Sequence, residues 1–211
     1  RVLFRSRRAG GNGYGTGTKG NGIHPATGKP TTGETGFIEI AHPDKLIAVP
    51  DNSLVDGVFV PKSDELTIST TGLQATGIPK TTGKTWDYFK FGPSAGFTSN
   101  QIDGIDFNQA PQTIVAMHAN KGITFDLAAI RKTHDFGKSR FTTRFGHSGA
   151  KDESRLDFTI LLDGKSIVEV RDFLAQQKGY EVDMPLPESA RFLTLVVTEG
   201  GQGISHDQAI L

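Results

Sequence analysis

The sequence predicts an all-β protein that folds as an antiparallel sandwich, and three features support this class. Short apolar runs separated by turn residues follow one another from residue 37 onward, at the spacing typical of sandwiches and barrels. Apolar and polar residues alternate in the runs 123–127 and 156–162, as a strand with one buried face requires. Asp163-Gly164 lies between two apolar runs and accepts the positive φ angles of a tight turn, which predicts a β-hairpin at 155–171.

The remaining elements follow from the same patterns. Residues 191–197, RFLTLVV, are apolar on both alternating sets, which predicts a central strand covered on both faces. Two stretches are helix-like, 128–132 and 170–179, and the second ends on Gly179, a residue typical of helix C-caps. Both stretches are short, so we expect less than ~15% helix and no change of fold class.

The N-terminal part differs in composition from the rest. Residues 10–36 contain ten glycines interleaved with threonine, asparagine and lysine, and such a stretch buries too little apolar surface to order itself. We expect 1–36 to be a poorly ordered linker or long loop, 37–84 a short β-strand segment that leads into or packs on the sandwich, and 85–211 the sandwich itself. Residues 1–6 resemble a translated sequencing adapter, and the chain stops abruptly at residue 211. We therefore expect a fragment of a longer gene product, with the sandwich truncated at its C-terminus.

Charge and cysteine content exclude several classes. The chain carries 23 basic and 23 acidic residues, so a nucleic-acid partner lacks its main electrostatic attraction. Without cysteine there are no disulfides, no thiolate catalysis and no cysteine-ligated metal. The longest apolar run is far shorter than the ~20 residues that span a bilayer, so we expect no membrane insertion by this segment.

Three strings resemble catalytic or nucleotide-binding motifs, but each lacks its structural context. GPSAG (92–96) needs a helix directly after the serine and is followed by turn-like residues. In GIPKTTGKT (77–85) the spacing between the two glycines is one residue too long for a phosphate loop, and GTGTKG (15–20) follows no strand. We expect that the chain is not an enzyme. A carboxylate pair for glycoside hydrolysis stays open, because the required separation is spatial.

Metal sites are weakly indicated. The six histidines show no short paired spacing, so we predict no catalytic metal and no cofactor. Asp103 with Asp106, or Asp152 with Asp157, could supply oxygen ligands for a structural calcium ion, although isolated acidic residues in loops are usually solvated or bonded to turns.

Four segments of the C-terminal part occur in an order typical of a known family. They are MHANKGITFDL (117–127), FTTRFGHSG (141–149), LDFTILLDGKSI (156–167) and RFLTLVVTEGGQGISHDQAIL (191–211). On these segments, the stretch from about residue 85 to 211 resembles the NPCBM family, a carbohydrate-binding module found beside family 98 glycoside hydrolases. The resemblance implies a galactose-binding-like jelly-roll β-sandwich that binds a galactose-type or other neutral glycan without catalysis.

The upstream segments resemble a second set of sequences. GGNGYGTGTKGNGIHPATGK (10–29), VDGVFVP (55–61) and TWDYFKFG (85–92) are similar to segments that accompany this module in planctomycete proteins, often after a FecR-like domain. The resemblance implies an exported, periplasmic or cell-surface setting.

The expected ligand site lies at the loop ends near His118, Arg144 and Asp207, with Trp86 or Tyr88 as a stacking face. This placement rests on the resemblance together with residue chemistry, since these polar groups can hydrogen-bond sugar hydroxyls and aromatic rings stack on pyranoses. Each position has a structural alternative. Trp86 would be a core cap, His118 a buried histidine and Asp207 the cap of a glycine-rich turn.

Two other functions stay open, because aromatic residues outside core-facing positions are few. The chain could be a structural or protein-interaction sandwich that binds no sugar. It could also be an accessory part of an envelope enzyme whose catalytic domain lies outside this sequence.

Overall fold

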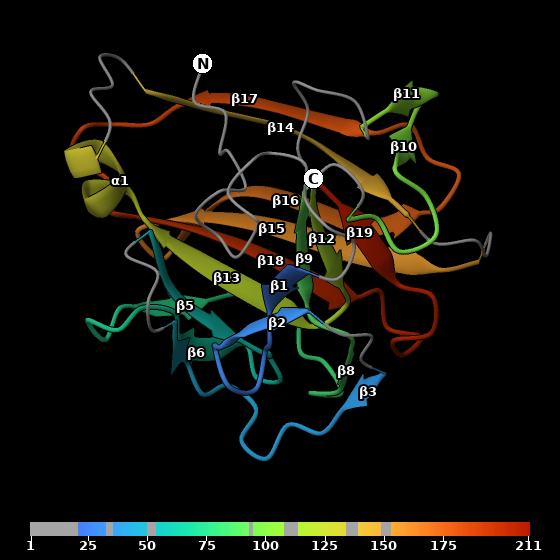
Figure 1. Ribbon diagram of the computed structural model, residues 1–211, viewed down its shortest axis with the longest axis horizontal. Helices are drawn as coiled ribbons and strands as arrows, with labels where there is room; N and C mark the ends of the chain where they lie inside the picture. The colour runs from blue at the N-terminus through green and yellow to red at the C-terminus, as the bar shows by residue number, and fades with distance from the viewer. Residues whose placement is uncertain are drawn as a thin grey trace.

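The chain folds as an antiparallel β-sandwich, as the sequence predicts. The computed structural model describes residues 21–32, 36–49, 54–92, 95–107, 114–133, 139–148 and 153–211. Within these ranges every strand pairing is antiparallel, and the single α-helix is α1 (Leu127–Thr133). Two large sheets form the layers of the sandwich, and three two-stranded sheets lie around them (Figure 1).

One layer is a seven-stranded sheet. Its strands, in spatial order, are β17 (Tyr180–Pro185), β14 (Arg140–His147), β19 (Gln208–Ile210), β12 (Ile114–His118), β9 (Phe89–Gly92), β1 (Asn21–Ile23) and β2 (Pro30–Thr32).

The other layer has six strands. In spatial order they are β16 (Lys165–Leu174), β15 (Arg155–Leu162), β18 (Phe192–Glu199), β13 (Lys121–Asp126), β5 (Val55–Phe59) and β4 (Ile47–Ala48). The central strand β18 is buried at every position, which confirms the expectation for RFLTLVV.

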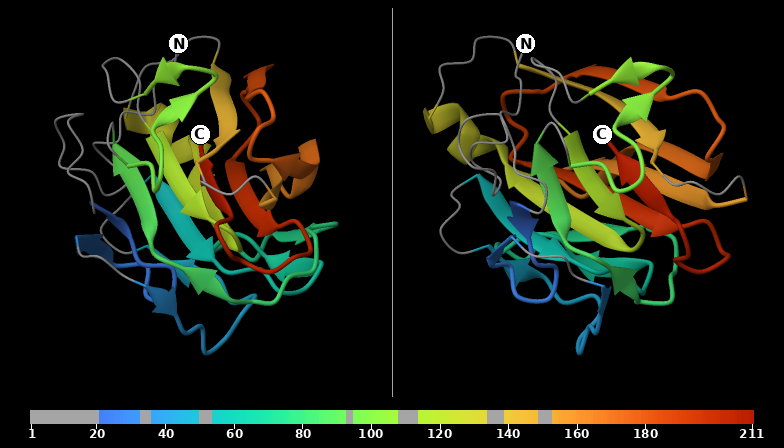
Figure 2. Two further views of the ribbon diagram at one scale, coloured as in Figure 1. Left: turned by 90° about the vertical axis from the view of Figure 1, so that its right-hand side faces the viewer. Right: turned by 45° about the vertical axis from the view of Figure 1, so that its right-hand side comes forward.

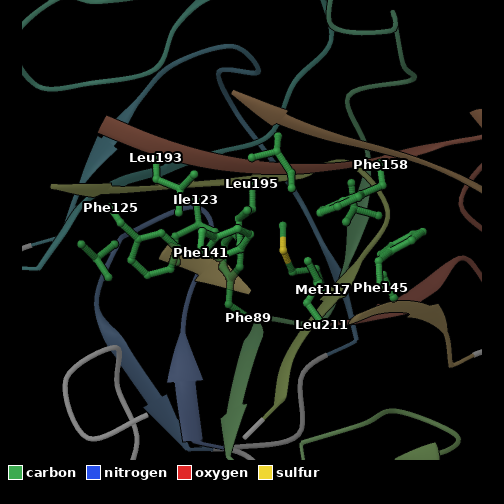
Figure 3. Close-up of a cluster of buried hydrophobic side chains, with 14 of the residues drawn as sticks. Phe89, Met117, Ile123, Phe125, Phe141, Phe145, Phe158, Leu193, Leu195 and Leu211 are labelled. Atoms are coloured by element: carbon green, nitrogen blue, oxygen red, sulfur yellow. The ribbon is translucent and has the colours of Figure 1, made fainter. Parts of the chain in front are cut away.

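The main core lies between the two sheets. Apolar side chains from both layers point toward one another there, including Phe89, Met117 and Phe145 from the seven-stranded sheet and Ile123 and Phe158 from the six-stranded sheet (Figure 3). The Phe145 and Phe158 rings stack with their centroids 4.3 Å apart. The alternation in 123–127 and 156–162 therefore marks the side of each strand that faces this core.

The outer faces of both sheets are also covered. Leu161 and Val196 pack with the hairpin of β6 (Glu65–Thr67) and β7 (Gln74–Thr76) on the outside of the six-stranded sheet. Ile114 and Ile210 pack beneath the segment 95–107, which contains β10 (Gln101–Ile102) and β11 (Ile105–Asp106), on the outside of the seven-stranded sheet. Double coverage explains why β18 is apolar on both sides.

The hairpin at 155–171 is confirmed, and its turn has Asp163 at φ 47° and Gly164 at φ 79°. The expected helix at 170–179 is wrong, because residues 165–174 form β16 instead. Residues Val170 and Phe173 are three apart, which imitates helical spacing, but they pair with Phe158 and Leu156, only two apart. A β-bulge inserts the extra residue, and Asp172 at φ 52° lies in it.

The expected helix at 128–132 is confirmed as α1. Asp126 begins it as an N-cap, because its carboxylate accepts a hydrogen bond from the Ala129 N–H at 3.0 Å.

Part of the expected linker at 1–36 is ordered. Residues 21–32 form the β1–β2 hairpin, and β1 pairs with β9, so this stretch belongs to the seven-stranded sheet. Gly22 is required there, because a Cβ atom at this position would lie 1.5 Å from the Phe89 carbonyl oxygen. The adapter-like and glycine-rich residues 1–20 lie outside the described residues.

The segment 37–84 is built into the sandwich as well, since β4 and β5 extend the six-stranded sheet. The remaining two-stranded sheet pairs β3 (Phe37–Ile38) with β8 (Thr85–Trp86). This β3–β8 sheet and the β10–β11 hairpin lie at opposite ends of the molecule (Figures 1 and 2).

Candidate carbohydrate-binding surface

Trp86 lies on the rim of the molecule, with 46% of its surface exposed. It pairs across the β3–β8 sheet with Phe37, which is 53% exposed. Thr85, the other residue of β8, is fully buried and turns its hydroxyl toward the sandwich. The two residues of β8 therefore point in opposite directions, and the tryptophan ring faces solvent rather than capping the core.

Tyr88 does not offer a stacking face, because it is only 1% exposed. Residues two apart on a regular strand share a face, so the sequence alone predicts that Trp86 and Tyr88 are equally exposed. Asp87 lies between them with φ 62°, and this left-handed residue ends the alternation. The structure therefore buries the Tyr88 ring, whereas a stacking face was expected to be exposed.

An ionic cluster that was not predicted from the sequence lies next to Trp86 in the chain and in the fold. The Lys90 ammonium is 2.6 Å from the Asp87 carboxylate and 4.3 Å from the centre of the Phe97 ring. The nearby Lys121 is completely buried, and burial lowers the pKa of its ammonium well below the ordinary value. The Asp87–Lys90 spacing of three residues was the one signal in the sequence that could have indicated the ion pair.

His118 lies on β12, facing the outside of the seven-stranded sheet, but it is only 4% exposed. The Phe97 ring meets it edge-on at 5.9 Å. Burial, with smaller contributions from Lys121 and other nearby cations, lowers the pKa of His118 to about 2. The imidazole is therefore neutral at ordinary pH, and covered from solvent.

Arg144 lies away from His118. Its guanidinium donates to the carboxylates of Asp103 (2.9 Å) and Glu181, so two acceptors on neighbouring segments engage it. The β12, β19 and β14 registers place it four residue rows from His118, about 13 Å along the strands. The structure does not bring these two candidates together.

Asp207 is adjacent to His118 in the fold but is buried, with 3% exposure. Its carbonyl oxygen accepts the Ala119 N–H at 2.8 Å, and its carboxylate accepts a hydrogen bond from the Arg155 backbone. Burial, with the nearby Glu199 carboxylate, raises the pKa of Asp207 to about 7. Asp207 thus binds a neighbouring strand, so the expected reach to a rim ligand is not found in the structure.

The turn between β12 and β13 holds the segment that carries Trp86. The two residues of this turn and the first residue of β13 bond three consecutive residues of the other segment. The bonds are Asn120 Nδ2 to the Lys84 carbonyl (2.9 Å), Thr85 Oγ1 to the Ala119 carbonyl (2.9 Å) and Lys121 Nζ to the Trp86 carbonyl (2.6 Å). We call these three bonds the Trp86 clamp.

Glu199 reinforces the clamp from β18. Its carboxylate accepts hydrogen bonds from the Thr82 N–H (2.7 Å), the Thr82 hydroxyl (2.9 Å) and Asn120 Nδ2 (2.9 Å). Its own N–H donates to Asn120 Oδ1 at 3.0 Å. The loop before β8 is therefore tied to both β18 and the β12–β13 turn.

Comparison with protein families gives a match for the C-terminal part of the chain. Residues 102–211, just over half of the sequence, match the NPCBM/NEW2 domain. The chain belongs to the NPCBM/NEW2 family. It is thus a carbohydrate-binding-type module, and the Trp86 clamp joins the matched segment to residues 84–86, which precede it.

Solved structures similar to this NPCBM/NEW2 protein include CBM51 modules. One is the CBM51 of a Clostridium perfringens GH95 protein in complex with methyl-galactose. It is 18% identical in sequence, the alignment covers 58% of this chain and 84% of that chain, and the TM-score is 0.46. Another is the tandem CBM51 pair of a Streptococcus pneumoniae family 98 glycoside hydrolase, with 18% identity, 58% and 39% coverage and a TM-score of 0.43. The chain thus spans well under two thirds of the second structure. No curated protein matches the chain.

The strings of the NPCBM/NEW2 chain that resemble catalytic or nucleotide-binding motifs lie partly within the described residues. Lys84 and Thr85 lead into strand β8, whereas a phosphate loop requires a helix there. Ser94 and the glycines of 15–20 lie outside the described residues. Among the residues that the structure describes, no helix has the length and apolar character to cross a membrane.

The structure describes three of the four acidic residues considered for calcium, Asp103, Asp106 and Asp157. In the described part of the chain, no three or more histidine and acidic side chains gather in a way that could hold a metal ion. Asp103 binds Arg144 and the Gly179 N–H, and Asp157 accepts the Asp172 N–H at 2.9 Å. Asp152 lies outside the described residues.

Proposed function

We propose that this NPCBM/NEW2 module binds a neutral glycan and serves a larger exported or envelope protein without catalysing a reaction itself. The observation that carries the proposal is the family match over residues 102–211. The balance of 23 basic and 23 acidic residues favours an uncharged ligand over a polyanion. A galactose-type or similar neutral sugar is the ligand class that the resemblance implies.

Of the residues expected to contact a ligand, we propose Trp86 as a direct contact. Its ring is the exposed aromatic surface among them, and stacking on an aromatic ring suits the apolar face of a pyranose. His118 and Asp207 act instead as buried supports of the neighbouring strands. Arg144 is engaged by two carboxylates and would reach a sugar only at the β10–β11 end.

The proposed setting is an exported, periplasmic or cell-surface protein, with a FecR-like domain as one neighbour. Its support is the similarity of 10–29, 55–61 and 85–92 to segments of planctomycete proteins. The flanking gene sequence tests this setting. It also tests the alternative that the chain is an accessory part of an envelope enzyme.

Binding of the labelled chain to a glycan array, followed by calorimetry with the best ligands, tests the function. We expect a Kd on the order of 0.1–1 mM, because a small site buries few atoms against the cost of association. A folded chain that binds no glycan would instead favour a structural or protein-interaction sandwich. The small number of exposed aromatic side chains among the described residues is the observation that favours this second candidate.

Lack of catalysis is tested with the same preparation. We expect no turnover of glycosides, esters or nucleotides. Turnover that disappears in Ser94→Ala or Lys84→Ala would show that one of the catalytic strings is functional.

A further inference from the structure

Phe37 and Trp86 are exposed aromatic neighbours on the β3–β8 sheet. They are directly opposed in the antiparallel β3–β8 sheet, and opposed residues project from the same face with Cβ atoms about 5 Å apart. Both are about half exposed, whereas aromatic residues of this size are mostly buried. Gly36 lies beside the edge of the Trp86 ring, since a Cβ atom on it would lie 3.7 Å away, at an ordinary contact distance. Two exposed aromatic rings side by side offer faces on which a sugar ring can stack.

Two exposed charged residues flank the pair in the described part of β3, β8 and their neighbours. Glu39 follows β3 and Lys84 precedes β8. One acidic and one basic residue therefore lie beside the rings. Carboxylate and ammonium groups can both hydrogen-bond hydroxyls, so this border suits an uncharged, hydroxyl-rich ligand.

A buried amine holds the backbone of Trp86, and burying that amine costs desolvation free energy. Lys121 is completely buried, and its Nζ donates to the Trp86 carbonyl at 2.6 Å and to the His118 carbonyl at 3.5 Å. Burial of an amine is unfavourable unless its hydrogen bonds are made. Asp87 favours the charged form of this amine and Lys90 opposes it. A buried lysine whose short bond ends on the backbone of the exposed tryptophan is well placed to fix the ring's direction.

We propose that Phe37 and Trp86 are a stacking platform for a pyranose ring of a neutral glycan, and that Lys121 is the residue that positions it. The inference rests on the proposed function and adds a specific site to it. The platform precedes the segment 102–211 that matches the family, and the Trp86 clamp connects the two. Ligand contact is thus made by one part of the chain, and its geometry is set by another.

Intrinsic fluorescence tests the platform directly, because Trp86 is the single tryptophan of the chain. The probes are methyl galactoside, N-acetylglucosamine and lactose, and calorimetry measures the same affinities. We expect a sugar-dependent change in emission, and at least tenfold weaker binding in Phe37→Ala and in Trp86→Ala, the latter measured by calorimetry alone. Tyr180→Ala is the matched control, since Tyr180 is 44% exposed on β17, and we expect its affinity to be unchanged.

The role of Lys121 is tested by Lys121→Met, which keeps the apolar stem and removes the amine. We expect about fivefold weaker sugar binding, together with stronger acrylamide quenching of Trp86 in the free protein. A loss of stability alone would not produce that spectroscopic change in the folded state. Thr85→Val removes a neighbouring bond of the clamp with little change of shape, and we expect the same two effects if Lys121→Met does not fold.

The outcomes separate the platform from the function. If the unaltered chain binds one of the sugars and Phe37→Ala and Trp86→Ala bind it equally well, the platform is refuted and the proposed function stands. If the folded chain binds none of the three sugars, the platform proposal fails for this ligand class together with its premise. Unchanged affinity and quenching in both Lys121→Met and Thr85→Val would refute the positioning role.

Discussion

Asn120 joins three parts of the fold, and its replacement tests how much the clamp contributes to stability. The side chain is completely buried, and its backbone has φ 63°, a left-handed conformation that asparagine and glycine tolerate best. Its amide donates to the Lys84 carbonyl and the Glu199 carboxylate and accepts the Glu199 N–H. Asn120→Gly removes these bonds and keeps the backbone unstrained.

The expected loss in the free energy of unfolding is about 4 kcal/mol for Asn120→Gly. The two bonds to neutral backbone groups contribute ~1 kcal/mol each, and the bond to a buried carboxylate contributes ~2 kcal/mol. Asn120→Ala should cost roughly 1 kcal/mol more than Asn120→Gly, because a Cβ atom disfavours the left-handed conformation. The difference between the two variants isolates the backbone strain from the lost hydrogen bonds.

Urea denaturation followed by circular dichroism measures both variants. Gln74→Ala is the control, because it removes an exposed 2.7 Å hydrogen bond to Thr67, and we expect a change within about 0.5 kcal/mol. If the free energy of unfolding of Asn120→Gly lies within about 1 kcal/mol of that of the unaltered chain, the hydrogen bonds of Asn120 do not stabilise the fold as expected here.

Three further predictions concern the core and the buried carboxylate. Phe158→Ala should lower the free energy of unfolding by about 3–5 kcal/mol in urea, because it empties a buried site stacked on Phe145; a loss below 1 kcal/mol would contradict this. Gly122→Ala should cost at least ~1–3 kcal/mol in the same assay, because its Cβ atom would lie 2.1 Å from the Phe59 ring; an unchanged midpoint would refute the close contact. Burial raises the pKa of Asp207 from 3.8 to about 7, so its contribution to stability is fully present below pH 3.8 and is lost as the pH rises through 7. Between pH 5 and 8 the free energy of unfolding should therefore fall less in Asp207→Asn than in the unaltered chain. Parallel plots of this free energy against pH for the two proteins would contradict the raised pKa.

Strand identity could be predicted where the pattern is local. Apolar side chains at every second residue specify a buried face whatever the partner strand is, so the hairpin at 155–171 is readable from Asp163-Gly164 and its flanks. The bulge at Asp172 was not predictable, because it depends on how β16 pairs with β15. That extra residue made a strand resemble a helix. Ile167 is exposed although Val168 and Val170 nearby pack against the core, and the cause is similar. The pairing of β15 with β16 shifts register a second time, between Ile160 and Leu161.

The ligand candidates were harder to predict, because exposure depends on contacts between distant segments. The left-handed Asp87 separates Trp86 from Tyr88, and nothing in the composition of WDY indicates it. Arg144 has the chemistry of a sugar contact, but its ion pair with Asp103 joins residues far apart in the chain. The apolar alternation of strands is a property of single segments, whereas an available polar group is a property of the assembled fold.

The order of strands has a practical consequence for producing the module. The segment 102–211 contains neither β9 nor β5, yet these strands pair with β12 and β13 inside the two sheets. A truncation at residue 102 would remove β9 and β5 and leave β12 and β13 each with an unpaired hydrogen-bonding edge beside apolar surface. Edges of this kind promote aggregation. We therefore expect soluble expression from a start upstream of β1, about 80 residues before the boundary that the family match suggests.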